Sequence, residues 1–146
     1  MSGRQTLAAI VIAKDEEANM ADCLAGLAFC DQIVVVDGGS SDRTVEIATA
    51  AGALVSVRPD WQGFGVQKQR ALDAATMDWV LSIDADERVS EALGAEIRQS
   101  IGRADVNGFR INRRSTFLGQ TMRHGGWFPD RILRLARRER CRFDQR

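Results

Sequence analysis

Short apolar runs rich in β-branched residues alternate with helical patterns through the first hundred residues of the chain. The runs cover Leu7–Ala13, Ile33–Val36, Leu54–Val57 and Trp79–Ile83. A strand that is apolar throughout is covered on both faces. Strands that alternate with helical patterns of about 10–15 residues indicate βαβ units and a parallel sheet. The pattern therefore predicts an α/β fold with a mostly parallel central sheet flanked by helices.

The segments between these runs predict four helices. The first begins at about Glu16, and the third covers Val66–Ala75. The second covers Asp42–Ala51, with Ser41 as its N-cap. The fourth begins after Ser90. Each helix has apolar residues at helical spacing, so each is expected to pack one face on the sheet.

The character of the sequence changes after Arg103. Gly108–Arg113 alternates apolar and polar residues, as a strand with one buried face does, and Ile132–Leu135 is a second short strand candidate. Phe117–Phe128, between them, is rich in glycine and aromatic residues. The length of 146 residues suits a single domain, since domains average about 100–200 residues. We therefore expect one domain over residues 1–146.

Composition excludes several classes of protein. With 45% hydrophobic and 27% charged residues, the chain is neither collagen-like nor disordered, and no apolar run reaches the about 20 residues of a membrane span. Its three cysteines form no C-x-x-C pair, which favours buried thiols in a reducing compartment over disulfides. Zinc is disfavoured as well, since His124 is the only histidine.

Charge is unevenly distributed although the formal net charge is zero. Residues Arg110–Arg146 contain eleven arginines and three acidic residues, whereas acidic residues exceed basic ones in the rest of the chain. The basic stretch is either a solvated strand face or a surface for an anionic acceptor or a membrane. We do not expect nucleic acid as a partner, because the acidic strand ends described next would repel phosphates unless a metal neutralised them.

Acidic residues follow three of the four predicted parallel strands. Asp15–Glu17 follows the first strand, Asp37 the second and Asp84–Glu87 the fourth. Ligands of open parallel sheets bind at the carboxyl ends of the strands. Carboxylates gathered there repel one another unless a positive group neutralises them, and Mg²⁺ or Mn²⁺ would do so. Asp84 and Asp86, spaced i, i+2, are the strongest candidates to hold a metal that also binds a diphosphate.

Other candidate residues have a structural alternative. Asp37, before Gly38 and Gly39, either accepts hydrogen bonds from a nucleotide or only caps a tight turn. Lys68 either reaches a phosphate or lies on a solvated helix face. His124 and Trp127 are candidates for the acceptor side, although Trp127 would serve equally well in the core.

Five segments of the chain resemble the inverting family 2 glycosyltransferases with the GT-A fold. They are Ile12–Glu17, Val35–Thr44, Trp61–Gly65, Trp79–Glu87 and Gly125–Leu135. Together they look most like the subgroup of lipopolysaccharide core β-glucosyltransferases. The resemblance implies a GT-A (Rossmann-like) fold that binds a nucleotide sugar, in one domain incomplete at its C-terminal end. It implies a cytoplasmic enzyme at the cytoplasmic face of the inner membrane.

The resemblance also implies roles for particular residues. Ala13 and Glu16 would line the uridine pocket, and Asp37 would contact the uracil or ribose. Lys68 would approach the base or the diphosphate. Within the Asp84–Asp86 motif, which includes Ala85, Asp84 would meet the ribose side and Asp86 would ligate the divalent cation.

The implied reaction moves a hexose, glucose in this subgroup, from a UDP-sugar to a saccharide or glycolipid acceptor by metal-assisted inverting displacement. The acceptor implied is the lipopolysaccharide inner core. The subgroup's catalytic base is expected beyond residue 146, and Asp130 is the nearest remaining carboxylate. The alternative is a domain that binds a nucleotide sugar without turnover because the base is missing. The chain departs from the subgroup in a second respect besides the catalytic base. It has Gln69 where the subgroup would have Asn.

Other enzyme classes fit less well. A haloacid-dehalogenase-like phosphatase would carry D-x-D on its first strand and Thr or Val where this chain has Arg88. A dehydrogenase would need G-x-G-x-x-G after a strand, which this sequence does not contain. The glycosyltransferase interpretation therefore leads, with non-catalytic binding as its rival.

Overall fold

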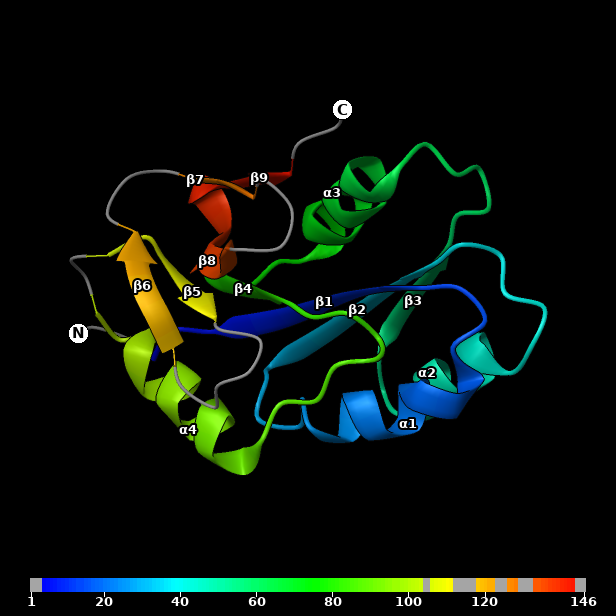
Figure 1. Ribbon diagram of the computed structural model, residues 1–146, viewed down its shortest axis with the longest axis horizontal. Helices are drawn as coiled ribbons and strands as arrows, with labels where there is room; N and C mark the ends of the chain where they lie inside the picture. The colour runs from blue at the N-terminus through cyan, green and yellow to red at the C-terminus, as the bar shows by residue number, and fades with distance from the viewer. Residues whose placement is uncertain (1–3, 104–105, 112–117, 123–125, 129–132, 144–146) are drawn as a thin grey trace.

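The computed structural model (Figure 1) describes residues 4–103, 106–111, 118–122, 126–128 and 133–143 of the chain. In chain order, the described elements are β1 (Leu7–Ala13), α1 (Glu17–Ala25), β2 (Gln32–Asp37), α2 (Thr44–Ala50), β3 (Leu54–Val57), α3 (Phe64–Ala74), β4 (Trp79–Ser82), α4 (Glu91–Ser100), β5 (Gly108–Ile111), β6 (Leu118–Met122), β7 (Gly126–Phe128), β8 (Leu133–Arg137), the 3₁₀ turn Arg138–Arg140 and β9 (Cys141–Phe143).

The main sheet has the strand order β3-β2-β1-β4-β8-β5-β6. The first four strands are parallel, as the βαβ pattern predicted. Ala13 on β1 is in register with Asp37 on β2, which is in register with Val57 on β3. The carboxyl ends of these strands therefore meet at one edge of the sheet.

Helices cover both faces of this parallel half. On β1, the side chains of Leu7, Ala9 and Val11 face a core that includes residues of α1, α2 and α4. Ala8 and Ile10, which alternate with them, face a second core with residues of α3 and β9. Figure 1 shows α3 on one side of the sheet and α1, α2 and α4 on the other. Burial on both faces explains why β1 is apolar along its whole length.

The other half of the sheet is antiparallel. β8 pairs with β4, β5 pairs with β8, and β6 pairs with β5, each antiparallel. The predicted strands at Gly108–Arg113 and Ile132–Leu135 correspond to β5 and β8 within their described residues. Outside the main sheet, β7 and β9 form a separate parallel pair. The predicted fold class is confirmed, with three antiparallel strands added to the parallel unit.

Local signals at the helix ends were partly wrong. Ser41 does not cap α2, which begins at Thr44. The Asp42 carboxylate instead accepts hydrogen bonds from the backbone and hydroxyl of Thr44, so the helix starts later than predicted. Ser90 does cap α4, because its Oγ accepts from the Leu93 amide at 3.1 Å. Gly52, just past α2, has the positive φ of +90° that favours glycine at such a position.

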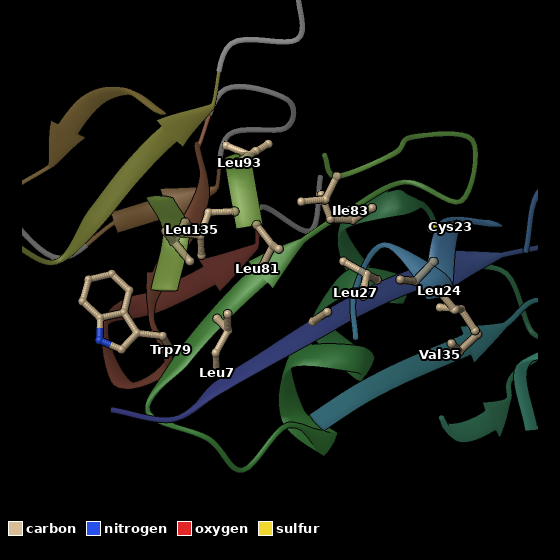
Figure 2. Close-up of a cluster of buried hydrophobic side chains, with 14 of the residues drawn as sticks. Leu7, Cys23, Leu24, Leu27, Val35, Trp79, Leu81, Ile83, Leu93 and Leu135 are labelled. Carbon is tan, nitrogen blue, oxygen red and sulfur yellow. The ribbon is translucent and has the colours of Figure 1, made fainter. Parts of the chain in front are cut away.

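The larger core supports the end of β4. Figure 2 shows Leu7, Leu81, Ile83 and Leu135 as members of this buried cluster. Trp79 is fully buried at the start of β4. Within the described part of the chain, no helix is long and apolar enough to cross a membrane.

Candidate functional site

Asp37 ends β2 with its side chain fully buried in the turn that follows. Its carboxylate accepts hydrogen bonds from the backbone amides of Gly39 and Ser40, at 2.9 and 2.7 Å, and from the Ser40 hydroxyl. Gly39 adopts a positive φ of +94°, which lets the chain turn back on the carboxylate. The capped-turn role is thus observed. A nucleotide contact by Asp37 stays a prediction and requires that a buried side chain become accessible.

The loops after β1 and β2 are joined by reciprocal hydrogen bonds. The Asp15 amide donates to the Ser40 hydroxyl at 2.7 Å, and the Asp15 carboxylate accepts from the Ser41 amide at 2.8 Å. Asp15 has a positive φ of 54°, uncommon for a residue other than glycine. These bonds fix how the two loops lie against each other at the edge of the sheet.

The same pattern continues into α1 and α2. The Glu16 amide donates to the Thr44 hydroxyl at 2.8 Å, and the Glu17 amide donates to the Asp42 carboxylate at 3.2 Å. The Thr44 hydroxyl and nearby backbone amides hold the pKa of the Asp42 carboxyl below its usual range. The acidic residues here are therefore stabilised by N–H and O–H donors. In this part of the edge, these donors offset the repulsion that the sequence analysis expected a positive group to offset.

The loop after β3 is held by α3. The Gln67 side chain is buried and donates to the Arg58 carbonyl at 3.1 Å. Arg70 forms an ion pair with Asp60 at 2.8 Å and hydrogen-bonds to Gln67 at 2.7 Å. Arg70 thus anchors the loop after β3 to α3. A buried glutamine inside a helix gives no sequence signal for this role.

The predicted D-x-D motif lies on a tight turn after β4. The Asp84 amide donates to Oε1 of Glu87 at 2.8 Å, and the Glu87 amide donates back to the Asp84 carbonyl at 2.9 Å. Ala85 is buried, Asp84 is partly exposed and Asp86 is exposed. The turn therefore directs one residue of the motif into the protein and leaves the Asp86 carboxylate accessible.

Arg88 links this turn to α1. Its guanidinium donates to the carbonyls of Ala85 and Glu87, at 3.2 and 3.0 Å, and to Oδ1 of Asn19 at 3.0 Å. Asn19 in turn donates to Oε2 of Glu16 at 2.9 Å. A continuous hydrogen-bonded path thus joins Glu16, a predicted uridine-pocket residue, to the turn that carries Asp86. The sequence analysis considered Arg88 only as a departure from another family and missed this role.

Lys68 reaches the same edge from α3. Its Nζ lies 3.9 Å from Oδ1 of Asp84, and its side chain is 14% exposed. Lys68 therefore lies beside the motif and not on a solvated helix face. The ammonium group of Lys68 and the carboxylate of Asp84 meet here, beside the turn that carries Asp86, where the sequence predicted a diphosphate and a divalent cation.

The floor of the turn is apolar. Cys23 on α1 is buried, and its thiol donates a long hydrogen bond to the Asp84 carbonyl at 3.7 Å. Burial raises the pKa of the Cys23 thiol to about 11. Cys23 therefore stays protonated near neutral pH and acts as a packing residue, as expected for the buried thiols.

The side chains that could ligate a metal ion can be compared with what such an ion requires. Among the described residues, no three His, Cys, Asp or Glu side chains lie close enough together to hold a metal ion by themselves. Asp84 and Asp86 offer carboxylate oxygens, and Mg²⁺ is commonly bound by only one or two carboxylates together with substrate phosphates. The two residues fit a cation that arrives with a diphosphate.

The side chains of the two acceptor-side candidates, and that of the nearest remaining carboxylate, are not among those that the structure describes. His124 and Asp130 are outside the described residues, and for Trp127 the structure describes only the backbone, in β7. Their proposed roles stay predictions.

Solved structures share this fold. Over 59% of this chain and 29% of the other, S. aureus TarS 1-349 in complex with UDP is 27% identical, with a TM-score of 0.54. Glucosyl-3-phosphoglycerate synthase from Mycobacterium tuberculosis, in complex with Mn²⁺, UDP and glucosyl-3-phosphoglycerate, is 24% identical over 70% of this chain and 42% of the other, with a TM-score of 0.58. The fold is that of the GT-A glycosyltransferases.

Sequence comparison identifies the family. The profile described as "Glycosyl transferase family 2" matches residues 8–143, so this chain belongs to that family. A curated relative is the lipopolysaccharide core biosynthesis glycosyltransferase LpsC of Rhizobium meliloti (strain 1021), which is 33% identical over 94% of this chain. The chain spans 53% of that relative's length.

Proposed function

We propose that this chain forms the donor-binding part of a glycosyltransferase that moves a hexose from a UDP-sugar to a saccharide or glycolipid acceptor. The observation that carries the proposal is the juxtaposition of Asp84, Asp86 and Lys68 at the carboxyl edge of the parallel sheet. The TarS structure with UDP and the synthase structure with Mn²⁺ and UDP support this choice of ligands. The similarity to LpsC, a lipopolysaccharide core biosynthesis glycosyltransferase, supports a lipopolysaccharide core acceptor.

Each residue has a distinct proposed task. Ala13 and Glu16 line the pocket for uridine, and Asp37 shapes or contacts it from the end of β2. Lys68 neutralises charge on the diphosphate, and Asp84 lies on the ribose side. A positive group beside a phosphate stabilises the negative charge that builds up when UDP departs.

Asp86, with Asp84, would hold Mg²⁺ or Mn²⁺. The cation would supply Lewis-acid stabilisation to the leaving UDP. The Glu87 and Arg88 hydrogen bonds keep the turn folded, so that the exposed Asp86 carboxylate is already in position before nucleotide binds. Inversion at the anomeric carbon requires a carboxylate base on the acceptor side. We assign that role to none of the described residues.

The proposal includes a cytoplasmic location and a membrane contact through the basic residues of Arg110–Arg146. Among the arginines that the structure describes in this stretch, Arg137 and Arg138 are engaged inside the domain. Arg137 donates to the carbonyls of Val106 and Arg103, and Arg138 donates to that of Met77. The contact would therefore depend on other basic residues of the stretch, such as the exposed Arg140 and Arg142. Sedimentation with anionic vesicles, compared with neutral vesicles, tests it.

Calorimetric titration of UDP, first with Mn²⁺ and then with EDTA, tests the donor site. We expect binding that needs the metal, with GDP as the control for base selectivity. UDP release from UDP-glucose, with and without a saccharide acceptor, then separates transfer from binding without turnover. Equal UDP binding in Mn²⁺ and EDTA would contradict the metal role, and no binding in either would contradict the donor-site assignment.

A further inference from the structure

The Lys68 ammonium lies between a carboxylate and an aromatic ring. Its Nζ is 3.9 Å from Oδ1 of Asp84 and 5.9 Å from the centroid of the Phe143 ring. The three residues come from α3, the end of β4 and β9, so separate elements converge on one charged group. A ring centroid within about 6 Å of an ammonium group is in the range of a cation–π interaction.

Phe143 itself is held firmly. Its side chain is buried in the core that contains Ala71 and Leu72 of α3. Its backbone amide donates to Oε1 of Gln69 at 3.0 Å, and Gln69 directly follows Lys68. The ring and the lysine are therefore fixed to the same turn of helix. This contact also gives a structural role to Gln69, where the resembling subgroup would have Asn.

We infer that Phe143 is a positioning residue, which holds the Lys68 ammonium beside Asp84 where the diphosphate of the donor would lie. The inference rests on the proposed function. A lysine has a flexible four-carbon stem, and ordering it reduces its conformational entropy. A ring that already restrains the ammonium lowers the further ordering required when the diphosphate binds. Phe143 thus acts on the donor through Lys68 and does not touch it.

The first test compares ligands that do and do not carry the diphosphate. Phe143→Leu keeps an apolar side chain and removes the ring. With Mn²⁺ present, we expect the affinity for UDP to fall about threefold to tenfold and the affinity for uridine to stay unchanged. Phe143→Tyr should restore UDP binding. Cys141→Ala, at a buried position on the same strand, is the matched control and should leave UDP affinity unchanged.

A double-mutant cycle separates positioning from packing. In a Lys68→Gln background, Phe143→Leu should produce no further loss of UDP affinity, since no ammonium remains to position. Additive losses, or an equal loss for UDP and uridine, would overturn the inference and leave Phe143 as a core residue only.

A second readout needs no nucleotide. The chain has two lysines, Lys14 and Lys68, so ¹³C-dimethylation, which keeps the charge, gives two lysine signals that Lys68→Gln assigns. We expect the ring current of Phe143 to shift the Lys68 signal away from that of the exposed Lys14. The shift should be lost in Phe143→Leu and kept in Phe143→Tyr. An unshifted Lys68 signal in the wild type would overturn the inference, whereas absence of UDP binding with the shift intact would overturn only the proposed function.

Discussion

The turn after β2 and the turn after β4 each follow a parallel strand and contain aspartate. The two turns differ in whether the aspartate carboxylate is buried and hydrogen-bonded or exposed. Asp37 is buried, and three donors from its own turn surround its carboxylate. After β4, the side chains of Glu87 and Arg88 bond to the backbone of the turn, Glu87 as an acceptor and Arg88 as a donor. The carboxylate of Asp86 is left exposed. Acidic residues at a strand end thus fall into two groups. Some accept the hydrogen bonds that hold the turns in place, and others are accessible to a ligand.

The difference shows how to interpret an acidic cluster. A carboxylate that accepts several N–H bonds is already stabilised in its charged form and requires no cation. One that accepts none within the protein keeps its oxygens free for water or metal. At this edge, whether a carboxylate accepts hydrogen bonds from the protein distinguishes the acidic residues better than their position along the sheet does.

The largest effect should come from Asp86→Asn. Removing the exposed carboxylate should abolish the Mn²⁺-dependent part of UDP binding, measured by calorimetry. The midpoint of thermal unfolding should remain unchanged, because the hydrogen bonds described above for this turn do not involve the Asp86 carboxylate. Surface substitutions usually change stability by less than about 0.5 kcal/mol. Asp22→Asn, at an exposed position on α1, is the matched control and should change neither quantity. Unaltered UDP affinity in Asp86→Asn would refute the metal assignment.

Ile83→Ala, one residue before the motif, should lower the stability of the protein, which Asp86→Asn should leave unchanged. Ile83, 6% exposed, belongs to the larger core (Figure 2) and directly precedes the turn. Truncation of a buried isoleucine costs about 2–5 kcal/mol, and we expect that loss in urea unfolding. A loss below about half a kcal/mol would contradict the buried anchor, since such truncations do not cost so little in a packed core.

Asp37→Ala tests the other turn. The substitution leaves two backbone amides without their acceptor, and unsatisfied buried donors cost about 1–3 kcal/mol. We expect the free energy of unfolding to fall by that amount, with weaker UDP binding as a consequence. Ser40→Ala, which removes only the hydroxyl donor, should have a smaller effect. If Asp37→Ala weakens UDP binding at full stability, Asp37 contacts the nucleotide and the contrast between the two turns fails.

Much of the fold was predictable because it depends on period and burial. The continuous apolar run of Leu7–Ala13 predicted a strand buried on both faces, and the apolar spacing after Ser90 predicted an amphipathic helix. Both are observed. The antiparallel attachment of β8 to β4 was not predictable, since a short strand carries no signal for its partner. Ser41 failed as a cap because Asp42, one residue later, competes for the same amides.

The site was predictable in its residue types and less so in its contacts. Asp84, Asp86 and Lys68 were identified from position and charge, and the structure brings Lys68 to Asp84. The support given by Gln67 and Arg88 was not, because each bonds to backbone carbonyls of distant loops. Such bonds depend on the path of the chain in three dimensions and leave no local pattern.

The smallest expected effect is a pH dependence of stability that arises from Cys23, which is buried beside the β4 turn. It is absent near neutral pH. The pKa of the Cys23 thiol is raised from 9.0 to about 11 by burial, so the unfolded chain loses this proton at lower pH than the folded one. Its contribution to stability is therefore fully present below pH 9 and is lost as pH rises toward 11. Urea unfolding of Cys23→Ala and wild type should show a difference that is constant up to pH 9 and then narrows. A difference in the free energy of unfolding that stays constant through pH 11 would mean that water reaches the Cys23 thiol. The side of the β4 turn that packs on α1 would then be open to solvent, as the side that carries Asp86 is.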